Sequence, residues 1–435
     1  MKTERRPRRF LLRNLVLHFR PTTVPEPTLK FTFTWGLGGM AVVLVMLQIV
    51  TGVMLKFVYE PIATQAYASV IHLQNDVPFG GFIRNIHFWS ANFLVVAVFL
   101  HLLRVFFTGA FHAGRRFTWV VGLILFFLVL ASNFTGYLLP WDQLAYWAVT
   151  ISTGMLEYVP GIGLRIQHLV RGGPEIGQAT LGIFFALHTA VIPILMGGLM
   201  AFHFWRIRKA GGLAVSRPPE NEPDAAPASV PVVPGLLIRE AVVALLVIAF
   251  VCLMAAAIDT PVGAPANPGL SPNPTKAPWY FGGFQEMLLH FHPSFAVFVI
   301  PAIIFFALLL VPYVNLEETG AGIWFASRTG RRTAAIAAVS AVLFTGLLVF
   351  LDEFYMDWTG WMPDVSPFLS TGLIPAAGCF VVVAGCYLSA RKLFSATRME
   401  ALQAGFVFLT VSFVVMTLTC ALFRGQGMRL MWPWP

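Results

Sequence analysis

Nine long apolar segments are the feature of this sequence that most constrains its fold. We predict them near residues 34–58, 84–107, 118–139, 180–206, 236–258, 294–314, 334–351, 369–390 and 402–423. A helix needs about 20 apolar residues to cross a bilayer, and each segment has roughly this length. The composition agrees, because 57% of the residues are hydrophobic and 11% are charged, compared with about 25% charged in soluble domains. The sequence therefore predicts an all-α, polytopic membrane protein.

The loops between these segments alternate in charge. One set holds the basic N-terminus and four further basic clusters, which are Arg115 and Arg116; Arg206, Arg208 and Lys209; Arg328, Arg331 and Arg332; and Arg391 and Lys392. The other set is poor in basic residues and contains Asp352, Glu353, Asp357 and Asp364. The positive-inside rule places the basic set in the cytoplasm. We therefore expect a protein of the inner (cytoplasmic) membrane with its N-terminus inside and its C-terminus outside. The net charge of +9 is then a topology signal, and no nucleic-acid partner is predicted.

Composition also divides the chain into five predicted parts. A cytoplasmic linker at 211–234 contains the stretch "SRPPENEPDAAPASVPVVP", which is typical of flexible chain. A cytoplasmic extension (1–30) and a four-helix domain (31–210) precede it. A second domain (235–315) and additional C-terminal helices (316–435) follow it. The four cysteines lie in apolar runs without C-x-x-C spacing, so we predict neither a disulfide framework nor a zinc site.

Four of the 10 histidines lie inside predicted spans, in two pairs. His87 and His101 are 14 positions apart on the second span, and His188 and His203 are 15 apart on the fourth. Such spacings return each pair to within roughly 40–60° of one helix face and separate its members by about 21–22 Å. Both spans run from outside to inside, so His87 with His188, and His101 with His203, would form two stacked bis-imidazole sites. Paired imidazoles with no open position suit haem iron in electron transfer. A single such histidine would more simply be a hydrogen-bonded packing residue.

Glycines repeat the same spacing on the two spans that lack these histidines. Gly38 and Gly52 are 14 positions apart on the first span, as are Gly122 and Gly136 on the third. Glycine admits a flat ligand close to a helix backbone, although alone it more often indicates helix packing. In register with the histidines, the glycines favour two porphyrins inside a four-helix bundle.

Four arginines are candidate partners for the anionic groups of such a cofactor. Arg84 precedes His87 by three residues and Arg104 follows His101 by three, so each lies about one turn beyond a predicted ligand. Arg206 and Arg208 lie beyond His203 and would bind quinone oxygens or haem propionates at the inner face. Interfacial anchoring and positive-inside charge are the simpler explanations for these residues.

Three stretches carry a family resemblance. "TGYLLPWDQLAYWAV" (135–149), "IRNIHFWSA" and "LVRGGPEIGQATLGIFFALHT" closely resemble cytochrome b of the cytochrome bc and b6f complexes. Residues 31–210 resemble the b6 type, and residues 235–315 resemble the family's subunit IV, which carries part of the quinol site. In the b6 type a cysteine before the Leu-Gly-Gly of the first helix holds an additional covalent haem. This chain has Gly36 there, so that haem is not predicted.

The resemblance implies a dihaem subunit of a quinol:cytochrome c (or similar acceptor) oxidoreductase complex. It implies quinol oxidation near the outer surface, quinone reduction near the inner haem, and coupled proton translocation. The expected partners are a Rieske-type iron–sulfur protein, a c-type cytochrome, the quinone pool, membrane lipid and a second copy of the complex.

The outer quinol motif departs from the family. The family's Pro-Glu-Trp-Tyr becomes Ala277-Pro278-Trp279-Tyr280, so proline replaces the glutamate that is held to accept a quinol proton. Glu286 is our candidate replacement, and we expect burial to raise its pKa. Asp142 is the alternative acceptor, with Tyr137, Tyr280 and Trp279 lining the pocket. The simpler explanations are an interfacial carboxylate and an aromatic belt.

Two other functions are considered. A dihaem b-type membrane anchor would exchange electrons between the quinone pool and a non-Rieske peripheral or multihaem partner, and Pro278 favours it. A transporter or channel would show inverted repeats and unpaired charges at mid-membrane, and the sequence shows neither.

Overall fold

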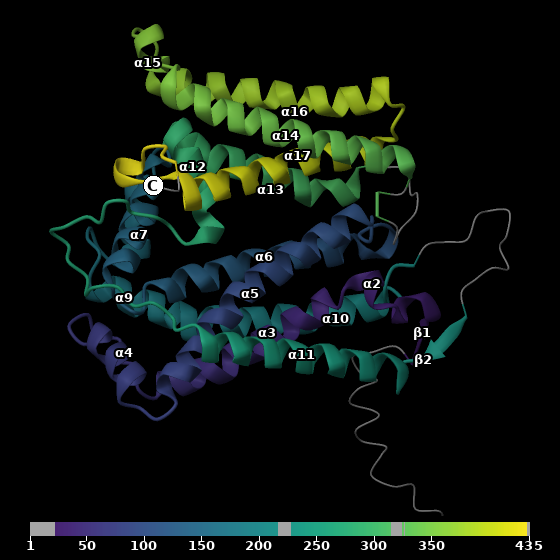
Figure 1. Cartoon of the computed structure of the whole chain (residues 1–435), viewed down its shortest axis with the longest axis horizontal. Helices are drawn as coiled ribbons and strands as arrows, with labels where there is room; N and C mark the ends of the chain where they lie inside the picture. The colour runs from purple at the N-terminus through teal and green to yellow at the C-terminus, as the bar shows by residue number, and fades with distance from the viewer. Residues whose placement is uncertain (1–21, 216–227, 315–323, 326, 433–435) are drawn as a thin grey trace, which may run out of the picture.

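The computed structural model describes residues 22–215, 228–314, 324–325 and 327–432, and it is almost entirely helical (Figure 1). Within these ranges nine helices are long and apolar enough to cross a membrane, as the sequence predicts. Most of the extension, half of the linker and the last three residues lie outside the described residues.

The first four spans form the predicted four-helix bundle. They are α3 (Leu37–Lys56), α5 (Gly80–Phe107), α6 (Arg116–Tyr137), and α9 (Gln178–Ala186) continued by α10 (Ile192–Lys209). The second span begins four residues before the predicted start at residue 84. Four short helices lie before the first span or in the connections between spans: α2 (Phe31–Thr34), α4 (Ala66–Asn75), α7 (Gln143–Gly154) and α8 (Gly163–Arg171).

The remaining five spans follow the linker. They are α11 (Gly235–Ala257), α13 (Ile300–Leu310) with its preceding turn, α14 (Arg328–Phe354), α16 (Ile374–Leu393) with its preceding turn, and α17 (Arg398–Leu418) with its following turn. Two short helices, α12 (Gly282–His290) and α15 (Trp358–Trp361), lie between them. A small antiparallel sheet pairs β1 (Thr23–Pro25) with β2 (Ser229–Pro231), with Thr23 opposite Pro231.

The helices form layers around α5 and α6. Figure 1 shows α13, α14, α16 and α17 on one side of this pair, and α3, α10 and α11 on the other. One apolar core packs the inner ends of α5 and α6, including Phe106 and Trp119, against Ala337 of α14 and Ala404 of α17. The late helices are therefore packed directly on the four-helix bundle.

Three spans contain a wide π-helical turn just before a proline. These turns are Leu187–Val191, Ser294–Val299 and Phe368–Leu373, and the prolines are Pro193, Pro301 and Pro375. Proline has no N–H and its ring crowds the preceding turn, so a single wider turn lets the helix continue past it. One of the three turns contains His188, and this affects the site described below.

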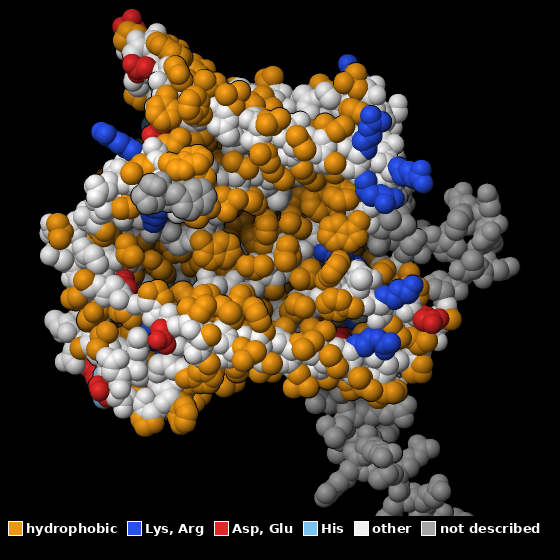
Figure 2. All heavy atoms as spheres, in the orientation of Figure 1, with side chains coloured by type: hydrophobic (Ala, Val, Ile, Leu, Met, Phe, Trp, Pro, Cys, Tyr) orange, Lys and Arg blue, Asp and Glu red, His pale blue; other side chains and the backbone are white. Residues whose placement is uncertain are grey.

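The surface is that of a protein in lipid. Leu245 of α11 and Val381 of α16 are 67% and 68% exposed, values that a helix in water would avoid. Figure 2 shows hydrophobic side chains over the flanks of the visible face, with most of its Lys and Arg gathered near the ends of α2 and α14. The chain is an integral membrane protein. The predicted side of each terminus stays a prediction.

Candidate functional site

His87 and His188, which we call the outer pair after their predicted side of the membrane, meet at one depth of the bundle. The rings of His87 on α5 and His188 on the fourth span have centroids 6.1 Å apart and planes inclined by 76°. A metal–imidazole bond is about 2 Å long, so two axial imidazoles on one metal have centroids about 6 Å apart. The separation of the two rings therefore fits a single iron between them.

Neighbouring groups fix the orientation of both outer rings. The Nδ1 atom of His188 lies 2.9 Å from the backbone oxygen of Ser132, which can only accept its proton. His87 Nδ1 lies 2.9 Å from the Thr51 hydroxyl, which itself donates to the Leu47 carbonyl and so accepts from the ring. With Nδ1 protonated, Nε2 is the free donor atom in each ring. This pairing is the usual arrangement behind a metal-binding histidine.

The π turn explains why the two histidine spacings differ by one residue. A π turn adds one residue to an α-helix without adding a turn. His188 lies inside such a turn, Leu187–Val191, so the 15-residue step to His203 covers the same rotation as the 14-residue step on α5. The two histidines of the fourth span therefore face the same direction relative to each other as the two histidines of α5, although their spacing in the sequence is one residue longer.

Each of the four glycines predicted to lie in register with the histidines lies against one histidine ring. A Cβ atom added at Gly38 would lie 3.4 Å from His101 Cε1, and one at Gly52 would lie 3.2 Å from His87 Cε1. The other two meet the fourth span in the same way. A Cβ at Gly122 would lie 3.4 Å from His203 Cε1, and one at Gly136 would overlap the His188 ring. The two helices without ligands therefore provide the room in which the rings lie.

We expect Gly136→Ala to displace the His188 ring, because the added methyl group has no free space there. The expected result is loss of about half of the bound haem, measured from the haem absorbance per chain. Gly197→Ala on α10 is the matched control, since a Cβ there meets nothing within 4 Å. Equal haem content in the two variants would contradict this prediction.

The inner pair lies at the other depth. His101 and His203 are close enough to repel one another when charged. Nδ1 of His203 is buried and faces the Thr118 backbone without a hydrogen bond of good geometry. The His203 ring therefore lacks the hydrogen bond that orients each of the outer rings.

The candidate arginines differ in their free hydrogen-bonding capacity. Arg104 is 3% exposed, and it donates to the Phe33 carbonyl at 3.1 Å while its Nε is buried without a partner. Nε of Arg206 is also buried without a partner. Unpaired buried donors are costly, so these two fit an anionic group at the inner end, such as a propionate. Arg208 is exposed at the end of α10.

Arg84 has a different role. Its guanidinium donates to Gln74 at 2.8 Å and to the carbonyls of Thr260 and Pro261 at 3.0 and 3.1 Å. The side chain therefore ties α5 to the loop after α11. Its predicted pairing with a propionate stays a prediction.

Haem fits these residues better than a bare metal ion. Among the described residues, no three His, Cys, Asp or Glu side chains converge as a metal site. Two opposed imidazoles, a glycine against each of the four histidine rings, and two arginines whose buried Nε atoms have no partner are instead what a porphyrin held by histidines requires.

The aromatic residues predicted for the quinol pocket gather at the outer end of the bundle. Tyr280 lies close enough to Tyr137 to interact with it electrostatically, and burial raises the pKa of the Tyr280 phenol. Trp279 donates from its indole N–H to Asn92 on α5 at 2.7 Å. These contacts hold the Pro278-Trp279-Tyr280 stretch against the four-helix bundle.

The carboxylate of Asp142 is already occupied by backbone groups. It caps α7 by accepting from the Ala145 N–H at 2.9 Å, and its other oxygen accepts from the Gly263 N–H at 3.0 Å. Asp142 therefore joins the start of α7 to the loop after α11, which is a structural role at an N-cap.

Glu286 is fully buried and belongs to an ion pair. Arg424 donates to its two oxygens from Nε at 3.1 and 3.0 Å and from Nη2 at 2.6 Å, and His290 lies 3.2 Å away. Burial acts to raise the pKa of Glu286, but hydrogen bonds from His290 and Arg424 outweigh it and hold the pKa below its ordinary value. The predicted rise in this pKa is wrong. The expected effect of burial is present, but it is outweighed by Arg424 and His290, which the sequence did not place beside Glu286.

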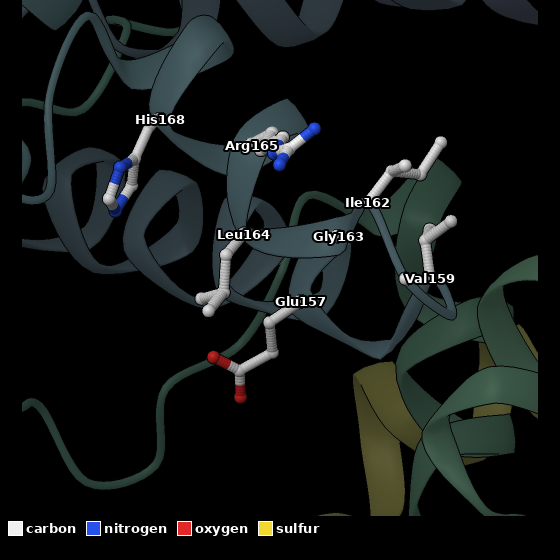
Figure 3. Close-up of a pocket in the computed structure, with 8 residues that line it drawn as sticks. Glu157, Val159, Ile162, Gly163, Leu164, Arg165 and His168 are labelled. Atoms are coloured by element: carbon white, nitrogen blue, oxygen red, sulfur yellow. The ribbon is translucent and has the colours of Figure 1, made fainter.

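Arg424 is the residue that sequence reasoning missed. It lies just after the last span, 138 positions from Glu286, and only its position as a lone arginine at a span end could have drawn attention to it. A separate pocket of about 500 Å³ lies on the outer connection (Figure 3). It is lined by Glu157, Leu164, Arg165, His168 and their neighbours, and none of the four candidate haem ligands lines it.

An apolar helical bundle with two opposed histidines against glycines defines a b-type cytochrome of the membrane. The profile of the cytochrome b/b6/petB family matches residues 23–211. Cytochrome b6 of Mastigocladus laminosus is 45% identical over 175 residues, which are 40% of this chain and 81% of the relative. Cytochrome b6 of Porphyra purpurea is 46% identical over the same coverage. The chain belongs to the cytochrome b/b6 family, and this family membership implies that it binds haem b.

A solved structure extends the likeness to the rest of the fold. A chain of a hyperthermophilic respiratory Complex III matches with a TM-score of 0.66, covering 95% of this chain and 96% of that one, at 22% identity. The C-terminal helices therefore follow the same fold as the solved chain.

Proposed function

We propose that this protein is the dihaem cytochrome b subunit of a quinol-oxidising cytochrome bc-type complex. The observation that carries the proposal is the His87–His188 pair, 6.1 Å apart, with each of the four candidate histidines lying against a glycine of a neighbouring helix. The names of its relatives, cytochrome b6 and a respiratory Complex III, support the same class of complex.

The residues divide the work between two depths. His87 and His188 would hold the outer haem through their Nε2 atoms, and His101 and His203 would hold the inner haem. Haem b supplies one-electron oxidation and reduction when bound. Thr51 and the Ser132 carbonyl orient the outer rings, the glycines admit the cofactor, and Arg104 and Arg206 compensate negative charge at the inner end.

The outer aromatic cluster is the proposed quinol-oxidation site. Trp279, Tyr280 and Tyr137 would line it, and a buried phenol stays protonated and can hydrogen-bond a quinol oxygen. Arg206 and Arg208 at the inner end would bind quinone. In this scheme one electron passes to a Rieske-type iron–sulfur partner and on to a c-type cytochrome or similar acceptor, within a dimer of the complex. Protons leave on the outer side.

The dihaem membrane anchor remains the second candidate. Proline stands at position 278 in place of the family's glutamate, and the nearest carboxylate, Glu286, rests in an ion pair with Arg424, so the outer site differs from the family pattern at its proton acceptor. An anchor needs no such acceptor, because its partner is a peripheral or multihaem protein without a Rieske centre.

Purification of the complex under mild detergent separates the two candidates. We expect a Rieske-type iron–sulfur protein to co-purify, with its electron paramagnetic resonance signal, and quinol to reduce half of the haem b rapidly. Co-purification of a multihaem cytochrome without any Rieske signal would replace the bc-type proposal with the anchor.

A further inference from the structure

A buried network of charged side chains joins α12 to α14 and to the segment after α17. The imidazole of His290 lies between two carboxylates: its Nε2 is 3.2 Å from Glu286 Oε1 and its Nδ1 is 2.6 Å from Asp352 Oδ2. Exposure of the side chains rises along this line, from 0% for Glu286 to 4% for His290 and 16% for Asp352. The line therefore runs from the interior toward the surface.

His290 has hydrogen-bond partners in both of its protonation states. When Nε2 carries a proton, it donates to Glu286 Oε1 at 3.2 Å. When Nε2 is bare, it accepts from Arg424 Nη2 at 3.3 Å, while Nδ1–H still donates to Asp352. A proton can thus bind to this ring and leave it without leaving a buried polar group unpaired. An unpaired buried group would be costly.

The surrounding charges determine where the proton rests. Glu286 faces His290 from α12 itself, Asp352 from α14, and Arg424 from the segment after α17, with Glu353 bonded to the far side of Arg424 at 2.6 Å. Burial lowers the pKa of His290, but hydrogen bonds to Asp352 and Glu286 outweigh it and raise the pKa above its ordinary value. Because the pKa of Glu286 is lowered, the resting proton lies on the imidazole.

We propose that Glu286, His290 and Asp352 form a proton-release relay that leads from the quinol site to the outer surface. The proposal rests on the proposed quinol oxidation. Glu286 follows Tyr280 by six residues, about 9 Å along the chain if it is helical throughout. The relay therefore begins on α12, which directly continues the turn that carries Trp279 and Tyr280 of the proposed quinol site.

Each transfer moves one proton and restores the starting state. His290 gives its Nδ1 proton to the Asp352 carboxylate, which releases it to water. The ring is now neutral and still carries its Nε2 proton, so it rotates and takes up at its bare Nδ1 the proton that a quinol hydroxyl has delivered to Glu286. The ring is then an imidazolium again, and Glu286 returns to its ion pair with Arg424. The two electrons of the quinol leave separately, to the acceptors named in the proposed function.

Two adjacent carboxylates on α14 provide a matched test. Asp352 contacts His290, whereas Glu353 contacts Arg424 Nη1 and the Leu430 N–H and makes no hydrogen bond to His290. Asp352→Asn keeps the shape but cannot accept the Nδ1 proton as a base. Glu353→Gln removes a neighbouring charge of the same network without touching the relay.

We expect Asp352→Asn to slow quinol oxidation by the intact complex about tenfold or more, with both haems still bound. The inflection that His290 gives to the rate–pH profile should move to lower pH, because the hydrogen bond that raises its pKa is lost. Asp352→Glu should restore most of the rate. Glu353→Gln should reduce thermal stability while leaving the rate and the profile close to wild type.

The outcomes separate the two proposals. Equal rates and profiles for Asp352→Asn and Glu353→Gln, in a complex that oxidises quinol, would overturn the relay and leave the proposed function standing. A wild-type complex that holds its haems but does not oxidise quinol would overturn both.

Discussion

Replacing His188 with alanine is expected to lower the haem content from two groups per chain to one. The outer site would lose one of its two proposed ligands. Among the described residues, the hydrogen-bond partners of the His188 ring are the Ser132 carbonyl and the Thr135 hydroxyl, and neither provides an imidazole nitrogen in its place. The inner pair lies about 21 Å away and should keep its haem. The measurement is haem b per chain in the purified protein, with the absorption spectrum of the remaining haem.

His168→Ala is the control for this substitution. His168 lies on the outer connection, exposed at the end of α8, and no predicted haem contact involves it. It should keep two haems per chain. A His188→Ala variant with unchanged haem content would remove His188 from the ligand set.

Replacing Arg424 with glutamine is expected to lower the free energy of unfolding by about 3–5 kcal/mol, because Glu286 and Glu353 would lose their cation. The guanidinium is fully buried, so water cannot compensate the carboxylates. The effect should be largest near neutral pH. Glu286 has a lowered pKa, so the stability from its charge is present above its unfolded pKa and is lost as the pH falls through the folded value.

The matched control is Arg429→Gln, five residues further along the same segment. Arg429 is exposed, and its side chain takes part in none of the ion pairs of the network. Thermal unfolding of the detergent-solubilised protein should show a clear loss of stability for Arg424→Gln and almost none for Arg429→Gln. Similar values for both would mean that the ion pair contributes little.

The membrane spans and the histidine register could be predicted from the sequence because both depend on local spacing. Apolar length alone locates nine helices, and 14-residue steps place His87 with His101, and Gly38 with Gly52, on one face of a helix. Each of these patterns can be recognised within a single segment of the sequence. The contacts of the glycines with the histidine rings follow from two such registers lying side by side.

Contacts between distant segments could not be predicted in the same way. The π turn at His188 changes the helical phase without leaving a clear sequence signal other than Pro193. The pairing of Glu286 with Arg424 joins α12 to the end of the chain, and it reverses the direction of the Glu286 pKa shift. The Asp142 carboxylate is a further example, because its hydrogen bond from the Gly263 N–H, which lies 121 positions away, does not follow from the sequence around Asp142.

The number of haem b groups per chain tests the central claim most directly. The opposed pair His87–His188, together with His101 and His203 and the glycines against all four rings, predicts two low-spin b haems per chain in the purified protein. A pyridine haemochrome assay combined with amino-acid quantification gives this ratio, and a reduced-minus-oxidised spectrum shows the ligation. Two haems per chain, falling to one in His188→Ala, is the predicted result. A ratio of one or zero in the wild-type protein would contradict the account.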